Sequence, residues 1–159
     1  MADRVEPVPE GVPTVVTRLV FDDATSAIAF YKDAFGATVP AEPYTAPDGK
    51  VVHSEVRIGD SVVYMTDEGD DRNGVAPSSV GGLVTAVMVL NVPDVDALWE
   101  RAVAAGCEVV YPLADQFYGD RAGRLRDPFG HQWMLSTHIE DVDRDEVGRR
   151  MQAWSEQQG

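Results

Sequence analysis

The sequence predicts an α+β fold made of two tandem βαβββ units, which form two curved antiparallel sheets, each backed by a helix, with an added C-terminal helix. One observation is a repeat. Val20-Phe21-Asp22-Asp23 leads into an amphipathic segment ending at Phe35-Gly36-Ala37, and Val92-Pro93-Asp94-Val95-Asp96 leads into one ending at Ala105-Gly106-Cys107. A second is that a strand hairpin follows each copy. Because hairpins dominate and each unit has one helical crossover, a doubly wound parallel sheet is excluded.

The composition divides the chain into five segments. The first is rich in proline and reads as a disordered arm, and the third is polar and reads as a linker. The expected boundaries are residues 1–13 for the arm, 14–67 for the first unit, 68–82 for the linker, 83–138 for the second unit and 139–159 for a helical tail. Residues 14–138 are expected to form one domain.

The first unit begins with a strand at 14–21, which is rich in β-branched residues. Asp22 or Asp23 then supplies an N-cap. Apolar residues recur at helical spacing up to Gly36, which is a natural helix stop. They are Ala24, Ala27, Ile28, Tyr31 and Phe35. A strand at 37–44 and a turn at Pro47-Asp48-Gly49 should follow.

The clearest hairpin joins strands at 51–58 and 61–66 through the two-residue loop Gly59-Asp60. This register pairs Val56 with Val63 and Glu55 with Tyr64. Because side chains alternate along a strand, the two faces separate. One face is apolar and should pack under the helix: Val56, Ile58, Val63 and Met65. The other is mixed, and should meet solvent or line a cavity: His53, Glu55, Arg57, Val62, Tyr64 and Thr66.

The second unit repeats this order. A strand is expected at 83–92, and Asp94 should cap a helix that ends at Gly106. Its apolar face is Val95, Leu98, Ala102 and Ala105. Further strands are expected near 108–113, 121–126 and 131–137, with Trp133 pointing to the helix side as core. The tail should form a helix at about 141–157 that covers the sheet or contacts a second subunit, with one apolar side: Val147, Met151 and Trp154.

The formal net charge of −14 repels phosphate backbones, so a nucleic-acid partner is not expected. It would favour a cationic ligand, or it only keeps the protein soluble. There is no apolar stretch of membrane-spanning length and no secretory signal at the N-terminus. The lone cysteine, Cys107, fits a reducing cytoplasm and should be core rather than a nucleophile.

Several stretches, in order, resemble the vicinal oxygen chelate superfamily, which includes glyoxalase I, bleomycin-resistance proteins and extradiol dioxygenases. They are Val20-Phe21-Asp22-Asp23, Ala29-Phe30-Tyr31-Lys32, Ile58-Gly59-Asp60-Ser61, Val95-Asp96-Ala97-Leu98, Gly119-Asp120-Arg121 and Asp127-Pro128-Phe129-Gly130-His131. The run from Asp127 to Trp133, followed by Thr137-His138, is most similar to the PhnB-like branch. The resemblance covers residues 14–140. It implies the fold more strongly than any one reaction.

The resemblance implies a divalent metal held by His, Gln or Glu on inner strands of both units. The corresponding positions here are Val16, Tyr64, Val87 and Met134. Tyr64 and Met134 each lie four residues past their turn, which supports the correspondence. Valine has no lone pair to donate, thioether sulfur is a poor ligand for such ions, and neutral tyrosine is weak. The sequence therefore predicts no metal cofactor at this site.

Other residues could carry chemistry. His53 and Glu55 share a strand face and could form a displaced metal site, act as an acid–base pair, orient a ligand, or form an ion pair with Arg57 or Arg121. His131 and His138 are the remaining histidines, and His131 at its turn should be structural. Tyr118 could reach over the cavity from a loop, or simply pack. The expected ligand-binding pocket consists of His53, Glu55, Tyr64, Tyr118, Arg121, Met134, Val16 and Val87.

The leading hypothesis is a metal-free binding protein that holds a small organic, possibly cationic, molecule in the concave cavity, as the resemblance to resistance proteins implies. The alternatives are an isomerase, lyase or dioxygenase of the superfamily, with or without metal, and an interaction protein without a ligand. A homodimer is expected, because a curved sheet leaves open edges and an uncovered face.

Overall fold

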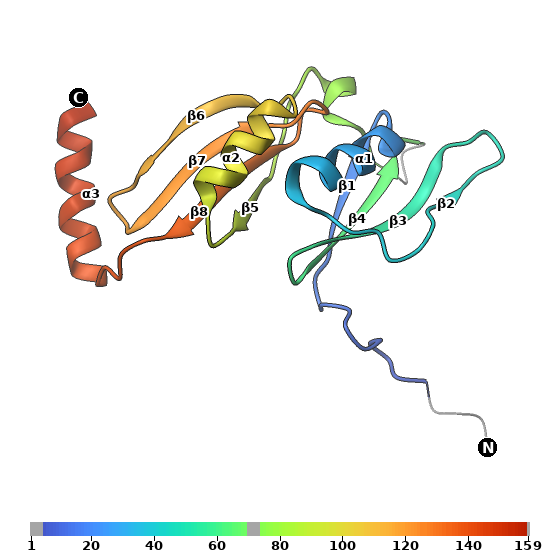
Figure 1. Cartoon of the computed structure of the whole chain (residues 1–159), viewed down its shortest axis with the longest axis horizontal. Helices are drawn as coiled ribbons and strands as arrows, with labels where there is room; N and C mark the ends of the chain where they lie inside the picture. Colours follow the sequence, from blue (N-terminus) through green and yellow to red (C-terminus); the bar gives the residue numbers. More distant parts are fainter. Residues whose placement is uncertain (1–4, 70–73, 159) are drawn as a thin grey trace. The chain divides into compact units, whose positions relative to one another are not determined.

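The computed structural model describes residues 5–69 and 74–158, which divide into two compact units, Met1–Gly81 and Gly82–Gly159. Each unit contains a four-stranded sheet backed by a helix, and the second unit ends in a third helix (Figure 1). The predicted α+β fold with tandem βαβββ units is confirmed. Residues 1–4 of the expected arm, 70–73 of the expected linker and 159 of the tail lie outside the described residues.

The first unit contains β1 (Thr17–Phe21), α1 (Ala24–Phe35), β2 (Tyr44–Thr45), β3 (Val51–Ile58), β4 (Ser61–Asp67) and the 3-10 turn η1 (Pro77–Val80). Its strand order is β1-β4-β3-β2. The second unit contains β5 (Val87–Asn91), α2 (Val95–Ala104), β6 (Glu108–Asp115), β7 (Asp120–Arg126), β8 (Gln132–His138) and the tail helix α3 (Arg144–Gln158). Its order, β5-β8-β7-β6, repeats that of the first unit.

Both sheets are mixed, although the sequence suggested antiparallel ones. The first strand of each unit runs parallel to the last, β1 with β4 and β5 with β8, while the hairpin pairs are antiparallel. The reason is geometric. The helix returns the chain to the end where the first strand began, and two hairpin reversals then bring the last strand into the same direction.

The first helix begins and ends where the sequence predicts. The Asp23 side chain accepts a hydrogen bond from the Ser26 amide at 2.9 Å, and Gly36 ends the helix in the left-handed conformation at φ 67°. Its buried face is the predicted one with Ala34 added: Ala24, Ala27, Ile28, Tyr31, Ala34 and Phe35. The second helix is capped by Asp94 and buries Val95, Leu98 and Ala102, whereas Ala105 lies outside it and is exposed.

The first hairpin also has the predicted register, with Glu55 opposite Tyr64 and Val56 opposite Val63. The predicted strand at 37–44 is wrong. Only an isolated bridge at Thr38 and the two-residue strand β2 form there. Pro40 and Pro43 interrupt this stretch, and proline lacks the N–H that a ladder needs. The strand predicted at 83–92 is likewise shorter and begins at Val87.

The helix-facing sides of the sheets form the cores. In the first unit this side includes Val56, Ile58, Val63 and Met65, all predicted, together with the buried Ser54. In the second unit, Trp133, Leu135 and Leu125 are buried under α2, so the expected core position of Trp133 is confirmed. Within the described ranges, no helix is long and apolar enough to cross a bilayer.

Candidate functional site

Three of the positions that correspond to metal ligands in the resemblance, Tyr64, Val87 and Met134, lie on strands and on the sheet faces opposite the helices, and Val16 lies immediately before β1. Tyr64 and Met134 are half-buried, and each alternates with core residues that face α1 or α2. Tyr64 pairs with Arg18 and Met134 with Val89, and Val16 and Val87 each lie two residues before those partners. The repeat therefore places the four positions equivalently in the two units.

These side chains do not fit a divalent ion. They offer one hydroxyl, one thioether and two hydrocarbon side chains, whereas a divalent site needs three or four converging nitrogen, oxygen or thiolate donors. The described residues contain no group of three or more His, Cys, Asp or Glu side chains placed to hold an ion.

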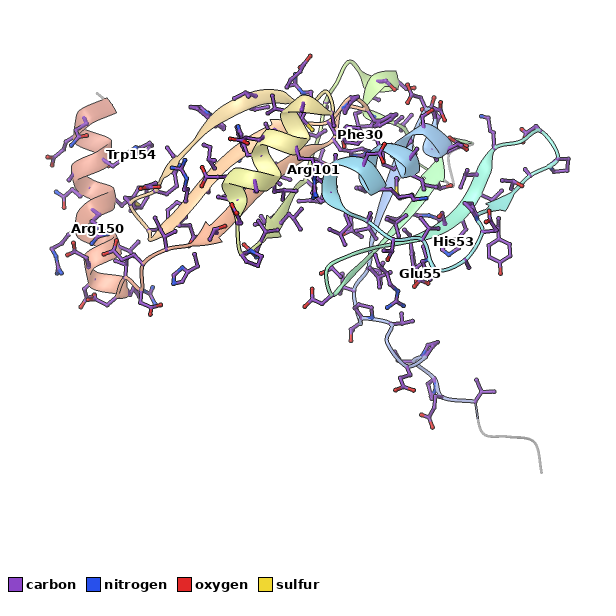
Figure 2. All side chains as sticks on the ribbon, in the orientation of Figure 1. Phe30, His53, Glu55, Arg101, Arg150 and Trp154 are labelled. Carbon is purple, nitrogen blue, oxygen red and sulfur yellow. The ribbon has the colours of Figure 1, made fainter. Side chains whose placement is uncertain are left out.

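His53 and Glu55 lie on the open face of the first sheet (Figure 2). The His53 ring packs edge-on against Tyr64, with the ring centres 4.8 Å apart, and lies 6.3 Å from the exposed Tyr44. Glu55 accepts a hydrogen bond from Arg57 at 2.9 Å. The sequence left several roles open for this pair, and the geometry shows one of them, the ion pair of Glu55 with Arg57. The His53 ring lies near the rings of Tyr44 and Tyr64.

A cavity of about 720 Å³ lies in the second unit, on the face of the sheet opposite α2. Its floor is formed by strands β6, β7 and β8, and its wall is formed by the 116–118 loop and α3. It is lined by Tyr111, Pro112, Ala114, Gln116, Tyr118, Ala122, Gly123, Arg124, Met134 and Trp154. Its size falls within the range of about 300–1,000 Å³ that is typical of small-molecule sites.

Irregular strand pairing helps to shape this cavity. The register of β6 against β7 shifts on both sides of Tyr111, and Pro112 has no N–H to donate. At this bulge, the Arg124 guanidinium carbon lies 5.2 Å from the centre of the Tyr111 ring. On β7, a Cβ added to Gly123 would come within 2.5 Å of the Trp99 ring of α2. Position 123 therefore faces α2, and its neighbours Ala122 and Arg124 face the cavity.

The tail helix forms one side of the cavity. Trp154 lies on the side of α3 that faces the β6–β7 hairpin (Figure 2), and its ring centre is 5.8 Å from that of Phe117. Arg150, one turn earlier, donates to both carboxylate oxygens of Glu140 at 2.8 Å and to Glu146. These bonds tie α3 to the segment that follows β8. Among its described residues α3 has no buried side chain, and Met151 and Trp154 are 53% and 49% exposed. The helix therefore lies beside the end of the β6–β7 hairpin without covering the sheet (Figure 1), and contact of the tail with a second subunit stays a prediction.

The structure does not bring all the expected pocket residues together. Tyr118 and Met134 line the cavity, whereas Val87 lies on β5 outside the lining. Arg121 is also outside, because its guanidinium is held by Asp96 of α2 at 2.7 Å and by Asp115 at 3.0 Å. Those hydrogen bonds hold the pKa of Arg121 above its ordinary value. The other four expected residues, His53, Glu55, Tyr64 and Val16, belong to the first unit.

Sequence reasoning missed Tyr111, Arg124 and Trp154 as lining residues. Alternation along 120–126 offers a signal, since it puts Ala122 and Arg124 on one face, but only the strand pairing shows that Arg124 lies opposite Met134. Burial, and secondarily the charge of Asp120, raises the pKa of the Tyr118 phenol. The phenol therefore stays protonated and can donate a hydrogen bond into the cavity.

Cys107 is buried, and burial with the nearby Asp127 raises the pKa of its thiol to about 12. A thiol with this pKa is not a nucleophile at neutral pH, in agreement with the expected core role.

His138, at the end of β8, lies between two carboxylates. Its ring nitrogens are 2.9 Å from Asp141 and 2.8 Å from Asp120. These hydrogen bonds, that of Asp141 first, raise the pKa of His138 above 6.5. The bonds favour the charged form in the folded state. Their stabilising effect is therefore complete below pH 6.5 and is lost as the pH rises through the higher folded-state pKa.

A proton NMR titration should therefore show the His138 pKa falling in Asp141→Asn and falling less in Asp120→Asn. Asp145→Asn, at the exposed start of α3, removes the same charge nearby and should leave the pKa of His138 almost unchanged. An unchanged His138 pKa in Asp141→Asn would contradict the geometry. An equal fall of the His138 pKa in Asp145→Asn would mean that the nearby negative charge in general, and not the hydrogen bond, raises this pKa.

Known proteins share both the sequence pattern and the fold. The family model of the glyoxalase/bleomycin resistance protein/dioxygenase superfamily matches residues 13–135. An uncharacterised protein of Mycobacterium bovis is 42% identical over 142 residues, which is 87% of this chain and 92% of that protein. An uncharacterised protein of Mycobacterium tuberculosis H37Rv is 42% identical over the same length, covering 82% of that protein.

Among solved structures, TioX from Micromonospora sp. ML1 superposes with a TM-score of 0.64 at 26% identity, covering 80% of this chain and all of that one. A PhnB protein from Bacillus cereus superposes with a TM-score of 0.61 at 17% identity, over 79% of this chain and 99% of that one. The fosfomycin resistance protein FosX from Mesorhizobium loti superposes with a TM-score of 0.56 at 16% identity, over 80% of this chain and 92% of that one. The last two likenesses show the fold alone.

Proposed function

Because the chain belongs to the glyoxalase/bleomycin resistance protein/dioxygenase superfamily, we propose that it binds a small organic molecule in the cavity of its second unit, without a divalent metal. The observation that carries the proposal is the cavity itself. It has the volume of a ligand site, and its lining is mostly aromatic and aliphatic with a few polar groups. The role is that of a binding protein, which holds the molecule without turning it over.

The proposed site is metal-free because the side chains at the corresponding positions have too few donor atoms for a divalent ion. Val16, Tyr64, Val87 and Met134 stand where the resemblance implies metal ligands, and together they offer one oxygen donor. His53 and Glu55 provide no substitute, because Glu55 is engaged by Arg57 and no third donor completes a cluster with them among the described residues.

Protein purified without added metal and dialysed against a chelator should keep its thermal midpoint and contain no stoichiometric nickel, zinc, iron or manganese. A neutral aromatic probe, 2-naphthamide, should raise the midpoint. At a probe concentration of ~100 times Kd, the rise should be about 5–10 °C. One bound metal ion per chain would overturn the metal-free proposal and revive the enzyme alternative.

A cavity-filling variant tests the location. Ala114 lines the cavity and is exposed, so Ala114→Trp should fill the space without disturbing the core, and should weaken 2-naphthamide binding by about tenfold or more. Ala104→Trp adds the same bulk at the exposed end of α2 and should bind as the parent does. Equal binding by both variants would place the site elsewhere.

We also propose that the chain forms a homodimer. Large apolar side chains on the open face of the second sheet are exposed, including Val89 at 56% and Tyr111 at 59%. Pairing with a second copy would remove such surface from water and cover sheet edges.

A further inference from the structure

We propose that the cavity of the second unit selects a flat organic acid, whose carboxylate or comparable oxyanion is bound by Arg124 and whose apolar body lies among Tyr111, Tyr118 and Trp154. This inference rests on the proposed function and adds the chemical class of the ligand. It reverses the cationic ligand that the net charge suggested.

The charge of the lining favours an anion. Arg124 is the only charged side chain among the described residues that line the cavity, and the remaining lining side chains are neutral. A cation in this space would lie beside a guanidinium with no carboxylate in the lining to offset it. An anion there would form a charge-assisted hydrogen bond, which is roughly twice as strong as a neutral one.

Arg124 has no carboxylate partner within the described part of the chain. Its Nε is buried and makes no hydrogen bond there. Nearby arginines differ. Arg121 is held by Asp96 and Asp115, and Arg126, whose own Nε is also unbonded, donates through Nη1 to Glu108 at 3.4 Å. In a chain with 27 acidic and 13 basic residues, an arginine without a carboxylate partner inside a cavity indicates a partner from outside.

The guanidinium of Arg124 also has a geometry that suits an oxyanion. Its carbon lies 5.2 Å from the centre of the Tyr111 ring, a contact with a ring face that occupies none of its N–H groups with an oxygen acceptor, and the planar fork of an arginine matches a bidentate oxyanion. Tyr118 adds a protonated phenol to the same lining. The ligand is therefore expected to carry two oxygens in one plane, as a carboxylate does.

The aromatic lining suits a flat apolar body. Tyr111 and Trp154 line the cavity but are 59% and 49% exposed, so a flat molecule between them would bury aromatic surface that water now covers. The side-chain nitrogen of Gln116 donates to the carbonyls of Ala114 and Ala122, so this amide braces the wall.

Three related probes test the inference: 2-naphthoate, 2-naphthamide and 2-naphthylmethylammonium, which differ in charge and share one ring system. Isothermal titration calorimetry should show 2-naphthoate binding about tenfold or more tightly than 2-naphthamide, with the ammonium binding most weakly. Arg124→Met should abolish the preference for 2-naphthoate while 2-naphthamide still binds. Arg124→Lys, which keeps the charge and loses the planar fork, should retain part of it.

The matched control is Arg126→Met, which removes the same charge from the same face of β7 outside the lining. It should keep most of the preference, whereas equal losses in the two methionine variants would mean general electrostatics and would overturn the role of Arg124. Tighter binding of the ammonium, or an unchanged preference in Arg124→Met, would also overturn the inference. If 2-naphthamide binds and 2-naphthoate gains nothing, this inference fails alone. If no probe binds, the proposed function fails with it.

Discussion

Replacing Asp127 with alanine is expected to lower the free energy of unfolding by about 3–4 kcal/mol. The Asp127 carboxylate is buried and accepts hydrogen bonds from the backbone amides of Phe129 and His131, each at 3.0 Å, and from the Trp133 indole at 3.1 Å. These bonds hold the turn between β7 and β8 and join it to the core. Without the carboxylate, the indole N–H of Trp133, only 3% exposed, would lack this partner in an apolar environment.

Urea unfolding, followed by circular dichroism, measures this loss. Asp127→Asn keeps one acceptor oxygen and should lose about half as much. Asp60→Ala removes an exposed carboxylate from the corresponding turn of the first unit, where it accepts only from Ser61 among the described residues. That control should change the free energy of unfolding by less than about 0.5 kcal/mol. A loss below about 1 kcal/mol in Asp127→Ala would refute the structural role assigned to the carboxylate.

Replacing Gly119 with alanine is expected to destabilise the second unit by about 3 kcal/mol or more. Gly119 has φ 98°, and a Cβ there would collide with the Glu140 carbonyl oxygen and come within 2.9 Å of Val142. The Gly119 carbonyl oxygen accepts from the amides of Ile139 and Glu140 at 2.9 Å. The collision would therefore displace the segment that leads to α3, and with it the Trp154 wall of the cavity.

Two other glycines separate the cost of backbone strain at positive φ from the cost of the Cβ collision. Gly59 has φ 60° and open space where a Cβ would lie, so Gly59→Ala should cost only the conformational strain, about 1–2 kcal/mol. Gly148 lies in α3 with nothing near its Cβ position, so Gly148→Ala should stabilise by about 0.5–1 kcal/mol. Thermal and urea unfolding of the three variants should rank them in this order. If Gly119→Ala lowers the free energy of unfolding no more than Gly59→Ala does, the collision with Glu140 is relieved without cost.

Much of the fold could be predicted because its signals are local. Asp23 and Gly36 bound a helix through the chemistry of a cap and a left-handed stop, and Gly59-Asp60 sets the register of one hairpin through its turn. The strand predicted at 37–44 failed because proline outweighed β-branched neighbours. The direction of β1 against β4 depends on the whole path of the chain, which no local pattern encodes.

The candidate site was harder to predict. Tyr118 and Met134 were expected in the cavity and do line it, because alternation and a loop position suffice to place them. Arg121 was also expected, but it lies near the carboxylate of α2, and a single strand does not show which neighbour a long side chain will meet. Trp154 could be assigned to the apolar side of a helix, but not to the strand that this side would face.

The sequence by itself determined the repeated unit, the ends of its first helix, the register of the first hairpin and the lack of metal donors at four positions. Each of these depends on residue type or on neighbours a few positions away. Tertiary structure alone decided that Arg124 and Tyr111 lie together in a cavity that α3 borders through Trp154, and whose charge is opposite to that of the whole chain. The physical reason is that net charge sums over all residues, whereas a bound molecule meets only those that strand pairing and helix docking bring within a few ångströms.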